Sequence, residues 1–205
     1  MEDSSNQNNE VEIAYHEAGH AIAYLEQGLP VFEISILEKA KKKPFCRSID
    51  AGKCIDRLFQ LEGIDAGKDF IKKNIIALYA GSEPYSNLDI SVVNNIKSCD
   101  WGVNTDFQLI VYYIELYLLK IGDDISDLDD FLSQLRKEAG QIVNNQWGKV
   151  QRLAEALLEK KALKKKGLVG LFPEYTKSYK YEDLIGIKYV YVFLKKKLLP
   201  LNLLQ

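Results

Sequence analysis

Two histidines placed four residues apart constrain this chain more than any other feature of its sequence. They are His16 and His20, the only histidines among the 205 residues, and Glu17 directly follows the first. On an α-helix, positions i and i+4 lie one turn apart on the same face, so two such imidazoles can bind one metal ion. The glutamate can then act as general base toward a water on that ion. The spacing predicts a helix that carries a catalytic zinc site; the alternative is an ordinary helix that merely contains both histidines.

The composition is that of an ordinary globular chain, with 47% hydrophobic and 27% charged residues. The net charge of −2 gives no bulk electrostatic reason to expect a nucleic-acid partner. Cys46, Cys54 and Cys99 form no CxxC pair, which suits a cytoplasmic or other reducing intracellular compartment. The polar, acidic start does not resemble a secretory signal, and no stretch of about 18 uncharged apolar residues predicts a transmembrane segment.

Apolar residues recur with helical spacing over most of the chain, which predicts a mainly α (α+β) fold. Residues 31–37, with a return over residues 45–49, predict a small β-hairpin or sheet after the histidine helix. We expect Ser126 to cap the last long helix, which bends near Gly140 or Gly148. The expected helices cover residues 10–27, 55–61, 66–81, 105–120 and 127–160.

The regions between and after these helices suggest how the chain is divided. Residues 84–103 show no clear period and predict a long loop, which in a compact domain is often functional. Residues 187–193 alternate like a strand, and residues 194–204 are basic and then apolar. We expect this tail to dock on the core, with a membrane surface or a partner protein as alternatives. The expected division is a flexible lead-in (1–10), the main domain (11–171) and a C-terminal tail of unknown role (172–205).

A catalytic zinc ion normally takes three protein ligands and leaves one position for water. Since there is no third histidine, the third ligand must be a carboxylate or a thiolate. The helix carries Glu26 about two turns beyond His20, and Asp106 in the first turn of a helix could equally serve as a cap. Spacing alone therefore leaves the choice open. The candidates are Glu26, Glu33, Glu38, Cys99, Asp100 and Asp106.

Two stretches resemble motifs of one known family. Ala14-Tyr15-His16-Glu17-Ala18-Gly19-His20-Ala21 looks like the AYHEAGHA motif of the peptidase domain of the FtsH family of ATP-dependent zinc metalloproteases. Gly102-Val103-Asn104-Thr105-Asp106-Phe107 is similar to that family's GASNDL motif, whose aspartate is the third zinc ligand. The resemblance implies that His16, His20 and Asp106 bind Zn2+ and that Glu17 is the catalytic base.

Three shorter similarities come in the family's order along the chain. Residues 34–36 sit where the family has its VTI strand, residues 76–81 resemble the helix that ends in LGG, and residues 153–159 resemble the C-terminal LAxxLLE helix. The resemblance thus covers roughly residues 11–171. The chain also departs from the family: it has no P-loop, no transmembrane segment, and Ser82-Glu83-Pro84-Tyr85-Ser86 where the family reads RAAEE.

The resemblance implies a hydrolase, a zinc metalloendopeptidase of the HExxH type, and the missing P-loop implies that it is ATP-independent. Without its own ATPase it would cleave unfolded or flexible protein substrates, or ones delivered by a separate unfoldase, and it could form a homo-oligomer. One alternative is a catalytically silent binding or regulatory protein that keeps the FtsH-peptidase-like fold. Another is a purely structural zinc site that is closed to water.

Overall fold

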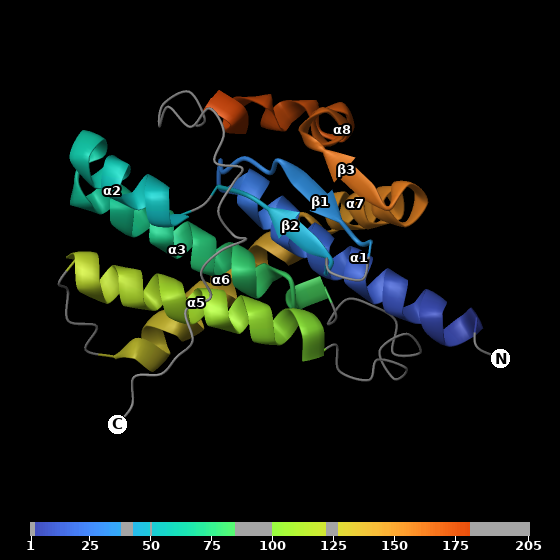
Figure 1. Ribbon diagram of the computed structural model, residues 1–205, viewed down its shortest axis with the longest axis horizontal. Helices are drawn as coiled ribbons and strands as arrows, with labels where there is room; N and C mark the ends of the chain where they lie inside the picture. Colours follow the sequence, from blue (N-terminus) through green and yellow to red (C-terminus); the bar gives the residue numbers. More distant parts are fainter. Residues whose placement is uncertain (1–2, 38–42, 50, 85–99, 122–126, 181–205) are drawn as a thin grey trace.

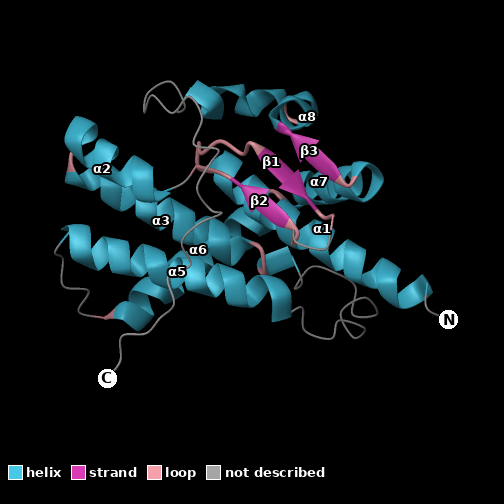
Figure 2. Ribbon diagram, viewed as in Figure 1, coloured by secondary structure: helices cyan, strands magenta, loops and turns pink. Residues whose placement is uncertain are grey.

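The computed structural model describes residues 3–37, 43–49, 51–84, 100–121 and 127–180 (Figure 1). These residues form a mainly helical fold with one small antiparallel sheet, which confirms the expected class (Figure 2). Within this part of the chain, no helix is both long and apolar enough to cross a membrane. The helices are α1 (Asp3–Glu26), α2 (Ala51–Glu62), α3 (Ile64–Ala80), α5 (Asp100–Ile121), α6 (Leu128–Asn145), α7 (Trp147–Lys160) and α8 (Lys165–Leu171), followed by the 3-10 helix η2 (Pro173–Lys180).

Helix α1 lies at the centre of the fold and packs against α3, α6, α7 and the sheet. It begins at Asp3 rather than near Glu10. Several of its buried positions are alanine or glycine, which lets neighbouring elements approach closely there; they are Ala14, Ala18, Gly19, Ala21 and Ala23. The tightest approach is at Gly19, where a Cβ atom would stand 2.3 Å from the carbonyl oxygen of Ala80. The end of α3 can therefore meet α1 only against a glycine, and this contact brings α3 to the turn of α1 that carries the histidines.

The sheet has the strand order β2-β1-β3, with β1 (Glu33–Ser35) antiparallel to both β2 (Phe45–Arg47) and β3 (Ala162–Lys164). Strands β1 and β2 are the predicted hairpin. Strand β3 was not expected, since three residues are too few to show a period in the sequence. Lys161, at a left-handed φ of 63°, ends α7 and turns the chain directly into β3.

The prediction of one continuous helix over residues 127–160 was wrong, although the break lies close to Gly148, one of the two positions where a bend was expected. The structure has two helices, α6 and α7, separated at Gln146, whose φ of −110° and ψ of 20° are not helical. The two helices have different main partners, α3 for α6 and α1 for α7, so tertiary packing favours the break. The cap of α6 is Asp127, whose side chain accepts a hydrogen bond from the Asp130 amide at 3.0 Å; Ser126 lies outside the described residues.

Other boundaries also differ from those expected. Helix α2 is longer than the predicted 55–61, and α5 begins at Asp100 instead of near Thr105. Gly167 and Gly170 lie within α8, a short helix that was not predicted from the sequence. The central part of the predicted loop, residues 85–99, and the predicted strand over 187–193 lie outside the described residues. The division into lead-in, main domain and tail stays a prediction.

Candidate metal centre

Three side chains from two helices converge on one point. His16 and His20 come from α1, and Asp106 comes from the beginning of α5. Asp106 Oδ2 lies 3.1 Å from His16 Nε2 and 3.2 Å from His20 Nε2, and the two Nε2 atoms are 3.0 Å apart. Ligand atoms in a tetrahedral zinc site, with bonds of about 2.0–2.1 Å, lie about 3.3 Å from one another. The structure thus brings together the three residues predicted as ligands, at separations that fit one shared ion.

The second nitrogen of His20 makes the ring suitable for binding a metal. Its Nδ1 lies 2.8 Å from the carbonyl oxygen of Ala77, and because a carbonyl can only accept, Nδ1 carries the proton and donates it. In the neutral ring Nε2 then keeps its lone pair, which faces His16 and Asp106. Metal-binding histidines usually have such a hydrogen bond on the nitrogen that does not bind. His16 is likewise hydrogen bonded to the backbone of Gly81.

Gly81 lets the chain after α3 pass directly over the two rings. A Cβ atom at this position would stand 2.3 Å from His20 Cε1 and 2.9 Å from His16 Cε1. No side chain fits in that space, so the glycine is required by the close approach. The two imidazoles are nearly perpendicular, at 84°, and each is covered on this side by backbone. The geometry of the cluster therefore depends on the end of α3 as well as on α1 and α5.

Burial and mutual attraction set the charges of the cluster. Burial, followed by the neighbouring His20, lowers the pKa of His16. Burial also opposes protonation of His20, but the Asp106 carboxylate outweighs it and raises the pKa of His20 to about 9. Burial would favour a neutral Asp106, yet the two histidines outweigh it and hold its pKa well below the usual range. The site thus stabilises an ionised carboxylate and strongly favours a positive charge beside it.

Glu17 lies beside this cluster without belonging to it. Its side chain is buried, and its Oε2 atom makes no hydrogen bond with the described residues. Burial raises its pKa to about 8. A buried carboxyl oxygen without a protein partner, one residue from a candidate ligand, fits a group that takes up and releases protons. This is the arrangement expected of the glutamate in an HExxH helix.

Two of the alternative third ligands pair with other groups. Glu26 accepts hydrogen bonds from Lys149 Nζ, at 2.8 Å, and from the hydroxyl of Tyr175. Glu33 forms an ion pair with Arg47, with 2.6 Å between Oε2 and a guanidinium nitrogen. The structure does not bring either carboxylate to the cluster. Glu38, Cys99 and the side chain of Asp100 lie outside the described residues.

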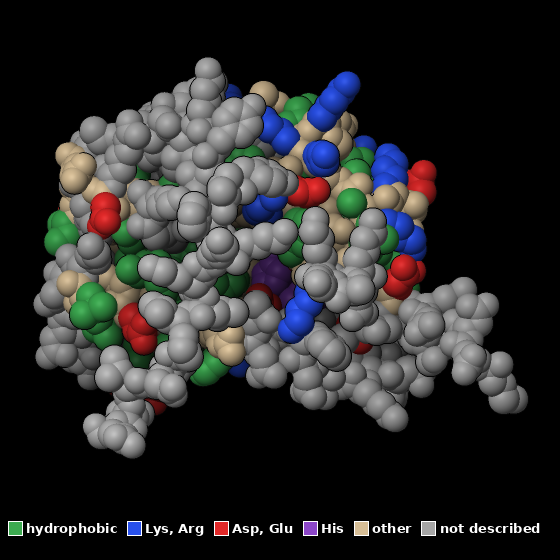
Figure 3. Space-filling view, viewed as in Figure 1, with side chains coloured by type: hydrophobic (Ala, Val, Ile, Leu, Met, Phe, Trp, Pro, Cys, Tyr) green, Lys and Arg blue, Asp and Glu red, His purple; other side chains and the backbone are tan. Residues whose placement is uncertain are grey.

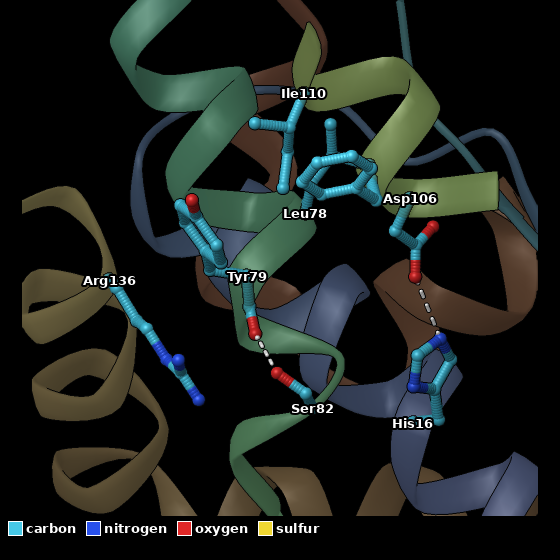
Figure 4. A pocket seen from close by; sticks show the side chains of 8 residues that line it. His16, Leu78, Tyr79, Ser82, Asp106, Ile110 and Arg136 are labelled. Carbon is cyan, nitrogen blue, oxygen red and sulfur yellow. Dashed lines mark hydrogen bonds and ion pairs between the residues drawn. The ribbon is translucent and has the colours of Figure 1, made fainter. Parts of the chain in front are cut away.

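A pocket of about 210 Å³ beside the cluster was not predicted from the sequence. Figure 4 shows His16 and Asp106 on one side of the pocket and Arg136, from α6, on the other. Leu78, from α3, and Ile110, from α5, lie between these two sides. Histidine atoms are visible near the centre of the molecular face in Figure 3, close to hydrophobic side chains. The sequence offered little indication of this pocket, because the residues that line it come from four helices far apart along the chain or from the turn after one of them. They are His16, Leu78, Tyr79, Ser82, Asp106, Phe107, Ile110 and Arg136.

Comparison with known proteins adds no assignment. No protein-family model and no curated protein matches this chain. The chemistry of the cluster must therefore be inferred from its own residues and their geometry.

Proposed function

We propose that this protein is a zinc-dependent metallopeptidase in which His16, His20 and Asp106 hold the ion and Glu17 is the general base. The observation that carries the proposal is the convergence of the three ligand atoms within 3.2 Å of one another. The buried Glu17 carboxyl beside them supports it further. The resemblance of the AYHEAGHA and GASNDL-like stretches to the FtsH peptidase domain points to the same four residues.

Two neutral imidazoles and one carboxylate are a donor set that zinc accepts. When bound there, the ion would make a water more acidic and polarise the scissile carbonyl. Glu17 would accept a proton from the attacking water and later donate it to the leaving amine. Its raised pKa suits this role, since a carboxylate that holds its proton more tightly is the stronger base. His20 would stay oriented by Ala77, and His16 by the backbone of Gly81.

The surroundings of the cluster support a flexible polypeptide as substrate. His16 and His20 are buried residues, with relative exposures of 7% and 4%. A folded protein surface could not place a peptide bond against them, whereas an extended segment could. The pocket would receive the side chain next to the scissile bond, and its Leu78, Phe107 and Ile110 walls favour an apolar one. These 205 residues contain no P-loop, so a substrate that they cleave by themselves would already have to be unfolded or flexible.

A casein assay tests the proposal. The zinc-loaded protein is incubated with fluorescently labelled casein, an unfolded substrate, with and without a chelator and after zinc is added back. We expect cleavage that the chelator abolishes and zinc restores. Zinc binding at one ion per chain without any cleavage would favour the silent binding protein, and failure to bind zinc would remove the metal site itself.

A further inference from the structure

A buried hydrogen bond joins α5, which carries Asp106, to α3. The Tyr113 hydroxyl donates to Asn74 Oδ1 at 3.0 Å, and both side chains are buried. Asn74 Nδ2 in turn donates to the carbonyl oxygen of Phe70 at 2.7 Å. That second bond fixes which way the amide faces, because only Nδ2 can donate to a carbonyl. Oδ1 is thereby left as the acceptor for Tyr113.

Tyr113 lies seven residues after Asp106, two turns along the same face of α5. Apolar packing by itself selects this face weakly, because α5 also exposes large apolar side chains. Leu119 is 81% exposed and Phe107 62%. A shift of one residue would rotate the helix by about 100° and carry Asp106 away from the histidines. A directional hydrogen bond discriminates between such rotations, whereas general apolar contact does not.

The same helix, α3, also orients the histidine side of the site. The carbonyl of Ala77, which accepts from His20 Nδ1, lies three residues after Asn74. Adjacent turns of α3 therefore make both contacts: Ala77 holds the imidazole of His20, and Asn74 holds α5, the helix that bears Asp106. The distance of 3.2 Å between His20 Nε2 and Asp106 Oδ2 depends on both attachments.

We propose that Asn74 and Tyr113 are positioning residues for the metal centre. Their hydrogen bond sets the rotation and height of α5 on α3, so that the Asp106 carboxylate reaches the ion held by His16 and His20. This inference rests on the metal site proposed above. Neither residue touches the ion or the substrate, and both act through Asp106.

The test has two readouts for each variant. One is zinc affinity, measured by competition with a chromophoric chelator, and the other is the visible spectrum of the Co2+-substituted protein. Tyr113→Phe removes only the hydroxyl. We expect zinc binding about tenfold weaker, the lower end of the 10- to 100-fold range for outer-shell partners, and a weaker four-coordinate Co2+ band. Tyr117→Phe is the matched control, one turn further along α5, where the buried ring packs on Phe131. It should bind zinc as the wild type does.

A double variant separates positioning from simple stabilisation. Asn74→Leu combined with Tyr113→Phe replaces both partners with apolar groups of similar shape, so much of the stability lost in Tyr113→Phe should return. A positioning role predicts that zinc affinity and the Co2+ band stay weak in the double variant. If zinc affinity returns together with stability, or if Tyr113→Phe binds zinc like the wild type, the inference is wrong. If the wild type itself binds no zinc, the metal site fails and the inference fails with it.

Discussion

Gly81 and His20 lie so close together that the glycine hydrogen occupies space in which a methyl group would overlap the imidazole. Gly81→Ala is therefore expected to displace the ring, weaken zinc binding by at least about tenfold and cost about 1–3 kcal/mol of stability, as overpacking usually does. Chelator competition and thermal unfolding measure the two effects. Gly148→Ala is the control, because a Cβ atom there meets nothing within 4 Å. Wild-type zinc affinity in Gly81→Ala would contradict the close approach.

Glu17→Gln should separate metal binding from catalysis. The amide cannot accept the proton of the attacking water, so hydrolysis of labelled casein should fall by about 10²–10⁴-fold. Zinc content should stay at the wild-type level, because Glu17 is not in the ligand cluster. Zinc is measured by elemental analysis and activity by peptide release. Equal activity in variant and wild type would rule out Glu17 as the base.

Asp106→Asn should lose zinc, because a neutral amide replaces the one charged ligand. We expect a loss of affinity greater than the 100-fold seen at most for outer-shell partners. Glu26→Gln is the matched comparison, since it tests the competing third ligand on α1 itself. That variant should keep its zinc and lose some thermal stability through the weakened contacts with Lys149 and Tyr175. The opposite pattern would make Glu26 the ligand.

The metal-free protein should lose stability as the pH rises from about 6.5 to 9. The pKa of His20 is raised from 6.5 to about 9, so its contribution is complete below pH 6.5 and is lost as the pH rises through 9. Glu17 acts in the same direction, because a pKa raised from 4.5 to about 8 makes its ionisation in the folded state unfavourable. The lowered pKa of His16 affects stability only below pH 6.5, because only there does the unfolded chain bind a proton at this histidine that the folded chain does not.

Denaturant unfolding at pH 6.5 and pH 9 in the presence of a chelator measures this slope. With zinc bound the trend should weaken or reverse, because the ion displaces protons from its ligands and binds more tightly as the pH rises. Glu17→Gln should show a shallower slope than the wild type in the metal-free state. A metal-free stability that does not change over this range would contradict the charges inferred for His20 and Glu17.

The sequence was enough to place His16 and His20 side by side in the candidate site, because residues four apart are brought to one face by helix geometry alone. It could not select Asp106 by spacing, since that carboxylate reaches His16 from 90 residues away through the packing of α5 on α3. The resemblance to a family motif supplied that residue. Asn74 offered one usable signal, as a polar residue on the otherwise apolar face of its helix, with Phe70 and Ile75 as neighbours.

The errors in the fold have a related cause. One expected helix becomes two at Gln146, two residues before Gly148, where only a bend was expected. The full break follows from the different main partners of α6 and α7. Strand β3 exists because β1 offers it an edge, which no local pattern in residues 162–164 reveals. Local periodicity thus gave the helical class, and long-range packing decided the boundaries.

The pairing of β1 with β3 also bears on how the protein is made. Residues 33–35 find one partner within the same hairpin, but the other is supplied only after residue 164 has been synthesised. A nascent chain that stops short of this point leaves one edge of β1 open on the ribosome. The sheet that packs beside the helix bearing His16 is therefore completed only after residue 164 has left the ribosome.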